Sequence, residues 1–241
     1  MVRFATRRAR PPTLERLEGL YAMRKAILHL TQADPVLAGI IERVGPFRIQ
    51  YAEPDFETLA RSIVFQQLSG KSARAIFARL KTAATGGTDG RVTPEGLRAL
   101  RAEAIRAVGL SRQKEAYLRD LAEKAAAGCI DFARLPRLPD PAVIEHLTAV
   151  KGVGVWTAQM FLIFALRRPD VLAVGDLGIR TAVRKAYRMR ALPPPARLER
   201  LGAKWRPYRS AACWYLWRSL SAPILITGPG AQHRVPQGKS K

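Results

Sequence analysis

The chain has 241 residues, of which 41 are Lys or Arg and 19 are Asp or Glu, so its formal net charge is +22 and its isoelectric point lies near 11.2. A hydrophobic content of 48% supplies a full core, which excludes a disordered chain. This excess of positive charge predicts binding to a polyanion, and because the basic residues are spread along the chain, nucleic acid is favoured over a membrane surface.

The two ends of the chain differ from the rest in composition. Residues 1–20 are rich in Arg and Pro, and residues 227–241 are rich in Gly, Pro, Gln and Lys. Both segments are therefore predicted to be flexible basic tails. Residues 21–226 show nearly continuous helical periodicity without a clear strand pattern, which predicts a single helical domain.

Helix start signals recur along this domain. A helix is predicted to start at Asp55 and to end at the segment 66–68. Thr93 and Ser111 are capping residues that mark two further starts, the first of them followed by Pro94 at the first helical position. Asp140, followed by proline, repeats this pattern of a capping residue and then proline, and predicts the start of the first helix of the hairpin. The apolar positions that predict one continuous helix after Thr93 are Leu97, Leu100, Ala104 and Val108.

A glycine-rich turn, Lys151-Gly152-Val153-Gly154, separates two apolar helical runs. Glycine tolerates positive φ and has no Cβ, so a phosphate could approach the amides at the start of the second helix, where the helix dipole favours an anion. Lys151 would add a mobile positive charge. The alternative is an ordinary turn in which the first glycine ends the preceding helix.

A single carboxylate follows the second run of the hairpin. After the turn at 167–170 and a short apolar segment, Gly175 and Asp176 precede a further predicted helix. Asp176 therefore lies near a helix N-terminus. It could be a catalytic acid, or simply the N-cap of that helix, a role for which Asp is a favoured residue.

These patterns predict an all-α fold. We expect a two-lobed helical bundle in which residues 55–150 form one lobe, and segments 21–54 and 175–226 fold together as the other. The hairpin and Asp176 would then lie near the cleft between the lobes, where a duplex could reach both.

Several features argue against a metal site or a membrane segment. Cys129 and Cys213 are far apart, and with three histidines the chain has no ligand spacing for zinc or an iron–sulfur cluster. The longest apolar run, 160–166, is far shorter than the roughly 20 residues of a membrane span, and the N-terminus lacks the apolar core of a signal peptide. We expect an intracellular monomer, cytoplasmic or nucleoid-associated in a bacterium.

Four motifs in order carry a resemblance to a known family. They read FETLARSIVFQQLSGKSARAIFARL (56–80), KGVGVWTAQMFLIFAL (151–166), VGDLGIR (174–180) and WRPYRSAACWYLW (205–217). Over roughly 24–223 the chain resembles the base-excision DNA glycosylases with a helix-hairpin-helix followed by a Gly/Pro-rich loop and an aspartate, particularly the 3-methyladenine branch. The bacterial inducible member of that branch has an extra N-terminal α/β domain, and too few residues precede the helical core here to build one.

The resemblance implies a monofunctional DNA glycosylase. Such an enzyme would flip an alkylated purine, of the 3-methyladenine and 7-methylguanine class, out of double-stranded DNA and hydrolyse its N-glycosidic bond, leaving an abasic site for base excision repair. No cofactor is expected, other than a monovalent cation that the hairpin carbonyls could hold. Two alternatives stay open: a non-catalytic DNA-binding module, and an enzyme of the same fold acting on oxidised or deaminated bases.

The resemblance also assigns roles to residues. Trp217 is the leading candidate for stacking on the flipped base, whereas Trp205 and Trp214 are predicted to be core residues. The full set comprises Asp176 for catalysis; Trp217, Trp156, Met160 and Leu177 for the base pocket; Gln66, Gln67 and Leu68 for the minor-groove wedge; and Lys151, Gly152, Val153, Gly154 and Arg180 for phosphate binding.

Four positions refine this picture. Trp156 stands where strand-cleaving relatives have a lysine nucleophile, so Schiff-base chemistry is not expected. Ala173 replaces the proline usual in the loop, and Met160 and Leu177 occupy pocket positions where some relatives are aromatic. The wedge itself could be either Gln67 or Leu68.

Overall fold

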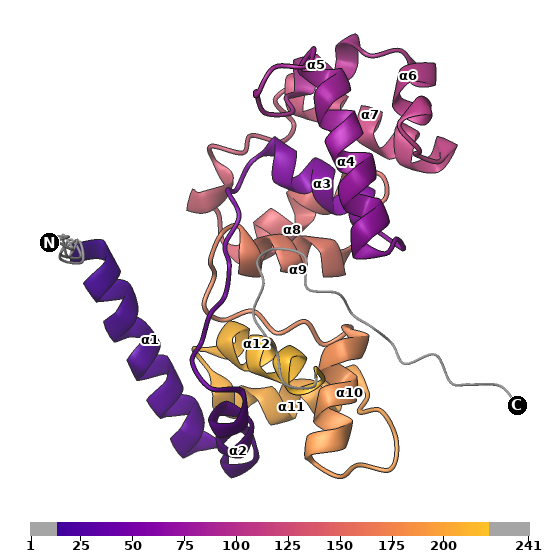
Figure 1. The fold of residues 1–241 in the computed structure, drawn as a ribbon. Coiled ribbons are helices and arrows are strands. Elements are labelled where there is room, and N and C mark those ends of the chain that lie inside the picture. Colours follow the sequence, from indigo (N-terminus) through magenta and orange to yellow (C-terminus); the bar gives the residue numbers. More distant parts are fainter. Residues whose placement is uncertain (1–13, 222–241) are drawn as a thin grey trace, which may run out of the picture.

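The computed structural model describes residues 14–221, and within this range it is helical with no strand, which confirms the all-α prediction. The helices form two groups, one above the other in Figure 1. The upper group comprises α3 (Phe56–Phe65), α4 (Gly70–Ala84), α5 (Pro94–Ala99), α6 (Ala102–Ala107), α7 (Arg112–Ala126), the 3₁₀ turn η1 (Leu135–Arg137), α8 (Asp140–Thr148) and α9 (Val155–Phe164). The lower group comprises α1 (Leu14–Ala33), α2 (Pro35–Val44), α10 (Leu177–Ala186), α11 (Pro195–Gly202), the 3₁₀ turn η2 (Ala203–Trp205) and α12 (Arg209–Ser219).

Each group has its own core, so the two-lobed prediction is also confirmed. In the first lobe α3 is central, and its Leu59 and Ile63 are fully buried. The buried cluster of this lobe runs from Phe56 to Val171. Helix α9 therefore packs with the first lobe, although the predicted boundary fell at residue 150.

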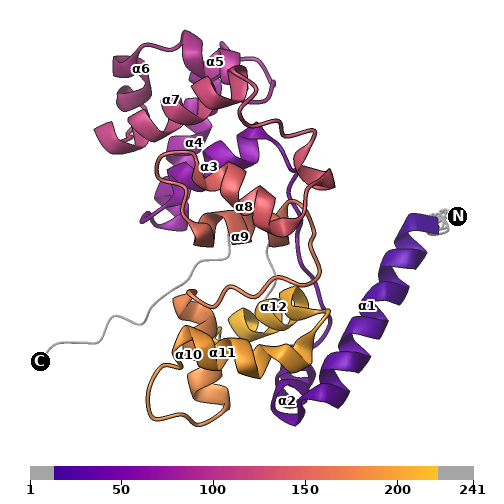
Figure 2. The same ribbon diagram turned by 180° about the vertical axis from the view of Figure 1, so that it is seen from behind.

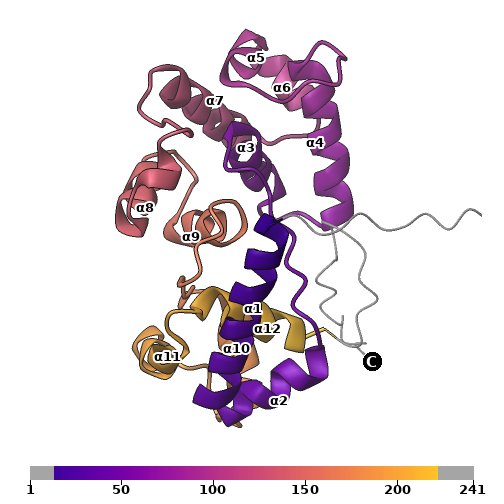
Figure 3. The same cartoon turned by 90° about the vertical axis from the view of Figure 1, so that its left-hand side faces the viewer.

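The core of the second lobe forms around α12. Seven consecutive residues of this helix, 210–216, are buried, so it is covered on all sides rather than along one stripe. Trp205 and Trp214 lie in this core, as predicted. Figures 2 and 3 show α10, α11 and α2 around α12, with α1 along the outside of the lobe.

A buried carboxylate fastens the N-terminal helices to the second lobe. Asp34 caps α2 and accepts hydrogen bonds from the side chains of Tyr187 and Trp205, with Lys204 Nζ 3.1 Å away. Burial opposes ionisation of Asp34, but these hydrogen bonds outweigh it and lower the pKa of the carboxyl below its usual value. The chain segments before α3 and after α9 thus meet in one folded unit.

Most helix starts agree with the capping signals. Asp55, Thr93 and Ser111 each accept a backbone N–H of the first turn. The cap predicted at Asp140 is wrong by one residue: Pro139 is the N-cap, and Asp140 lies inside α8. Its carboxylate forms an ion pair with Arg168 instead of capping the helix.

The single helix predicted after Thr93 is also wrong. The chain leaves helical geometry at Leu100, where ψ is 137°, and the helix is split into α5 and α6. The Leu100 carbonyl accepts a hydrogen bond from Arg119 Nη2 at 2.9 Å, so a contact with α7 takes the acceptor that a continuous helix would use internally.

The structure describes only a small part of the two predicted tails. Helix α1 begins at Leu14, so residues 14–20 are helical where a flexible tail to residue 20 was predicted. The remainder of that tail, residues 1–13, and the predicted tail 227–241 lie outside the described residues.

Candidate active site

Asp176 lies at the junction of the two lobes, with two indole rings around it. Trp156 Nε1 donates to Oδ2 at 2.7 Å, and Trp217 Nε1 donates to Oδ1 at 2.8 Å. Trp156 comes from the first turn of α9 in one lobe, and Trp217 comes from α12 in the other. The residue Asp176 is 8% exposed, so only a small part of it is open to water.

Asp176 is at the same time the N-cap of α10. Its Oδ1 accepts the Ile179 backbone N–H at 2.7 Å, so the capping alternative is correct as a description of the fold. The two roles are compatible, because a carboxylate has about four lone-pair positions. From the described residues Oδ1 accepts two bonds and Oδ2 accepts one, which leaves one acceptor position on Oδ2 for a ligand.

The indole of Trp217 is fixed from several sides. Its ring stacks on Phe164 at 5.7 Å between centroids, and it packs against the cores of both lobes. Gly178 makes room for it, because a Cβ there would lie 3.1 Å from Trp217 Cδ1 and 3.0 Å from Asp176 Oδ1. A side chain at this position in the first turn of α10 would thus press on both partners of the bond between Trp217 and Asp176.

The other predicted pocket residues gather at the same junction but are more open. Met160 is partly buried and, like Trp217, packs against both cores. Trp156 is 48% exposed and Leu177 is 63% exposed, unusual for residues of their size. The structure thus brings Asp176 and the four predicted pocket residues to one junction, with an exposed apolar rim.

The hairpin after α8 has two glycines in different environments. Gly152 has φ +78°, and a Cβ there would lie 2.1 Å from Tyr117 Cδ2. At Gly154, the N-cap of α9, a Cβ would meet no atom of the described part of the chain within 4 Å. Neither amide has an acceptor among the described residues, so both N–H groups are available to a ligand at the α9 N-terminus.

Val153 requires a correction. It was predicted to bind phosphate, but its N–H donates to the Val150 carbonyl at 3.0 Å and its side chain is buried. The tight turn uses this amide internally, so Val153 shapes the hairpin and leaves the donors to the two glycines. The Gly152 carbonyl also has a partner, Gln66 Nε2 at 2.9 Å.

The two predicted phosphate-binding cations differ in freedom. Lys151 is largely exposed, with its Nζ 3.8 Å from Asp120 Oδ1, while its backbone N–H donates to Asp120 Oδ2 at 2.8 Å. Arg180 is less free, because its Nε donates to the Pro193 carbonyl at 3.0 Å and so supports the loop after α10.

The segment predicted as the wedge leaves α3 abruptly. Gln66 is the C-cap of that helix, and Gln67 has φ +55°, a left-handed geometry that non-glycine residues rarely adopt. Leu68 follows with 38% of its surface exposed. Of the two wedge candidates, Leu68 is therefore the exposed apolar side chain.

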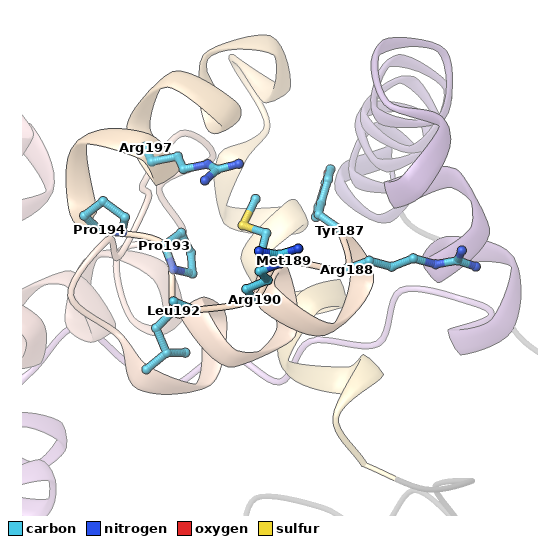
Figure 4. A pocket seen from close by; sticks show the side chains of 9 residues that line it. Tyr187, Arg188, Met189, Arg190, Leu192, Pro193, Pro194 and Arg197 are labelled. Atoms are coloured by element: carbon cyan, nitrogen blue, oxygen red, sulfur yellow. The ribbon is translucent and has the colours of Figure 1, made fainter.

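A separate concavity of about 450 Å³ lies elsewhere in the second lobe (Figure 4). It is lined by the loop from Tyr187 to Pro194 and by Arg197, at the C-terminal end of α10. Asp176 caps the opposite end of this ten-residue helix, about 15 Å away along its axis. This concavity is therefore distinct from the junction that holds Asp176.

The buried cysteine of the second lobe does not compete with Asp176 as a reactive group. Burial raises the pKa of the Cys213 thiol to about 12, so it stays protonated and inert. Among the side chains that the structure describes, those of residues 21–221, no three of His, Cys, Asp or Glu are placed to bind a metal ion. In the same range no helix combines the length and the apolar character needed to cross a membrane.

Comparison with known proteins places this arrangement in a family. Residues 60–207 match the model of the HhH-GPD superfamily of base excision DNA repair proteins, and the chain belongs to this superfamily. The matched segment contains the hairpin, Asp176 and most of the helices of the first lobe. The resemblance drawn from the four sequence motifs is thereby confirmed.

Individual relatives narrow the comparison. The chain is 36% identical over 210 residues to DNA-3-methyladenine glycosylase 1 of Schizosaccharomyces pombe, covering 85% of this chain and 91% of that protein. A solved 3-methyladenine DNA glycosylase from the same yeast, in complex with abasic DNA, superposes with a TM-score of 0.73 at 36% identity, over 84% of this chain and all of that one. A DNA-3-methyladenine glycosidase from Bacillus halodurans superposes with a TM-score of 0.71 at 37% identity, over 80% and 88% of the two chains.

Several residues of the site were not found from the sequence. Phe164 and Gly178 fix Trp217, while Tyr117 and Asp120 support the hairpin from α7. The glycine two residues after Asp176 was a usable signal, because glycine is disfavoured inside a helix unless space is needed. The α7 residues gave no comparable signal, since nothing local marks them as neighbours of the hairpin.

Proposed function

We propose that this protein is a monofunctional DNA glycosylase that excises alkylated purines, of the 3-methyladenine and 7-methylguanine class, from double-stranded DNA and leaves an abasic site for base excision repair. The observation that carries the proposal is the Asp176 carboxylate, held by the indoles of Trp156 and Trp217 between the two lobes. The similarity to 3-methyladenine glycosylases over most of the chain supports the same substrate class.

The arrangement around Asp176 suits glycosidic bond hydrolysis. When the bond to the base breaks, its electron pair leaves with the base and positive charge develops on the deoxyribose. A fixed carboxylate in a largely dry site stabilises that charge without reorganising. Water then adds to C1′ and loses a proton, for which the remaining acceptor position of Oδ2 is suited.

A single carboxylate suffices for alkylated purines. A purine alkylated at N3 or N7 already carries a positive charge, so it departs as a neutral molecule and needs little general-acid help. The same charge provides selection, because an electron-poor ring gains most from stacking on Trp217. Met160, Leu177 and the exposed ring of Trp156 would complete the pocket for the flipped base.

The remaining predicted residues would hold the duplex. Leu68 is our candidate for the wedge that fills the gap left by the flipped nucleotide, because it is apolar and exposed. The Gly152 and Gly154 amides and the Lys151 ammonium would bind the backbone. No cofactor enters this proposal; the hairpin carbonyls keep lone pairs with which a monovalent cation could assist phosphate binding.

The test is release of bases from duplex DNA treated with an N-methylating agent, analysed by chromatography. The proposal predicts free 3-methyladenine or 7-methylguanine, and no release from untreated DNA. Failure to release any base, with salt-sensitive duplex binding intact, would indicate a non-catalytic DNA-binding protein. Release of an oxidised or deaminated base from a second duplex that contains it, with no release from methylated DNA, would indicate a different specificity on the same fold.

The absence of strand cleavage is tested separately with abasic DNA and borohydride. Trp156 cannot form a Schiff base, so no covalent adduct is expected. An adduct that disappears in Lys151→Ala would overturn the monofunctional part of the proposal and identify Lys151 as a nucleophile.

A further inference from the structure

Helix α7 contacts both of the loops to which the proposed function assigns DNA binding. Three of its side chains, at intervals of three residues, face these loops: Lys114, Tyr117 and Asp120. Residues at this spacing follow one another along a single stripe of a helix. One stripe of α7 therefore lies beneath the loop at 66–68 and the hairpin at 151–154.

Lys114 holds the first of these loops. Its Nζ donates to the Val64 carbonyl at 2.8 Å and to the Gln66 carbonyl at 2.5 Å. These are terminal carbonyls of α3, where a cation also complements the helix dipole. The ammonium has no carboxylate partner among the described residues, and burial lowers the pKa of Lys114. The Lys114 ammonium thus interacts with the C-terminal end of α3.

Asp120 and Tyr117 hold the second loop. Asp120 accepts the Lys151 backbone N–H at 2.8 Å, and its position is fixed by Lys124, whose Nζ lies 2.6 Å from both carboxylate oxygens. The Tyr117 ring lies directly against Gly152, and its hydroxyl accepts Gln113 Nε2 at 2.6 Å. The hairpin therefore rests on α7 through both a hydrogen bond and a ring contact.

A direct bond also joins the two loops. Gln66 Nε2 donates to the Gly152 carbonyl at 2.9 Å, across 86 residues of sequence. Gln66 is thus held at its carbonyl by Lys114 and holds the hairpin through its side chain. The wedge loop and the hairpin thus contact each other directly and both contact α7. These contacts together fix the distance between the wedge and the phosphate-binding amides.

We propose that Lys114 is a positioning residue, which fixes the wedge loop relative to the hairpin so that Leu68 enters the duplex at the step next to the gripped phosphate. This inference rests on the proposed function for the identity of the wedge. Lys114 itself need not touch DNA. Its removal should misplace the wedge while leaving the hairpin able to bind a backbone.

The test compares the affinity of Lys114→Met for an undamaged duplex and for the same duplex with a tetrahydrofuran abasic analogue. The account predicts that the preference for abasic DNA falls at least about tenfold, while affinity for undamaged DNA changes by less than about threefold, the loss expected from one weak or distant charge. A 2-aminopurine opposite the abasic position should lose the fluorescence change that wedge insertion produces. Lys114→Arg should restore part of the preference, because a guanidinium can also donate to two carbonyls.

The matched control is Lys71→Met, which removes the same charge from the exposed start of α4, close to the same loop, where the Lys71 side chain makes no hydrogen bond or ion pair with the described residues. It should weaken both duplexes equally, or neither. Equal weakening of both duplexes by Lys114→Met would show a phosphate contact and overturn the positioning role. An unchanged preference in a folded variant would overturn it as well.

A second variant decides the case in which Lys114→Met does not fold. Gln66→Ala breaks the bond between the loops without burying an unpaired group, and should lower the preference for abasic DNA in the same direction. An unchanged preference in Gln66→Ala would contradict the linked-loop account. These readouts need no catalysis, so a wild-type protein that released no base would refute the proposed activity while leaving the positioning test intact.

Discussion

The two glycines of the hairpin should respond differently to substitution by alanine. Gly152→Ala should mainly lose stability, whereas Gly154→Ala should mainly lose affinity for DNA. In Gly152→Ala the new Cβ must enter the space of the Tyr117 ring, where the nearest carbon lies 2.1 Å away, on a residue whose φ is +78°. The positive φ costs about 1–2 kcal/mol for alanine, and overpacking costs about 1–3 kcal/mol. We therefore expect Gly152→Ala to lose about 2–5 kcal/mol of stability, or roughly 5–15 °C in Tm for a chain of this size.

In Gly154→Ala the new Cβ meets none of the described atoms, and the backbone is in an ordinary region at φ −91°. Because alanine is a poorer N-cap than glycine, we expect a loss of up to about 1 kcal/mol, or at most about 4 °C in Tm. The methyl group would instead hinder a phosphate at the α9 N-terminus, so duplex affinity should fall about tenfold, equivalent to about 1.4 kcal/mol.

Thermal unfolding and fluorescence anisotropy with a labelled duplex check both expectations. Tyr117→Ala provides an internal control, because removing the ring should leave Gly152→Ala with only the φ cost, and the two changes should couple by about 1 kcal/mol or more. A Gly152→Ala variant as stable as the wild type would refute this account of the turn. So would a Gly154→Ala variant that was destabilised as much as Gly152→Ala.

Three further outcomes follow from the site and the core. Lys151→Ala should reduce the slope of log Kd against log salt by about one, measured by anisotropy over a NaCl series, and an unchanged slope would remove Lys151 from the interface. Trp217→Phe keeps an aromatic but smaller ring and loses the N–H bond to Asp176, so single-turnover excision should slow at least about tenfold with little change in affinity for undamaged duplex, since hydrogen bonds to charged groups are worth about 1.5–3 kcal/mol. Burial opposes ionisation of Asp34, but its hydrogen bonds lower the pKa of the carboxyl below the usual value. The ionised carboxylate therefore stabilises the folded state above about pH 4, and this stabilisation is lost as pH falls through the folded-state pKa. In urea unfolding between pH 7 and pH 3 the stability gap between wild type and Asp34→Asn should therefore narrow, and a constant gap would contradict the assignment.

Local sequence signals predicted the local structure well. Thr93 and Ser111 were recognised as helix caps, and Asp55 as a helix start, because capping depends on only three or four neighbouring residues. Asp176 was recognised as near a helix start for the same reason. The break at Leu100 was missed because its cause, a bond from Arg119, lies in another helix.

The contacts that define the site are almost all non-local. Trp156 and Trp217 reach Asp176 across 20 and 41 residues of sequence, and no spacing rule relates such positions. Family resemblance supplied the residues, but it did not predict that both indole N–H groups would converge on the carboxylate. Lys114 went unnoticed because, by sequence, a lysine in a basic chain is an ordinary surface residue.

The central claim is that Asp176 performs the chemistry rather than only capping α10, and the Asp176→Asn variant separates these roles. Asparagine caps a helix about as well as aspartate, so folding and undamaged-duplex affinity should be retained, with a modest loss where the amide meets an indole N–H. The most direct measurement is single-turnover release of methylated purines by the wild type and by Asp176→Asn, with duplex binding measured alongside. We predict a rate at least about 10³-fold lower in the variant with binding preserved, whereas release at the wild-type rate would show that Asp176 is only a helix cap.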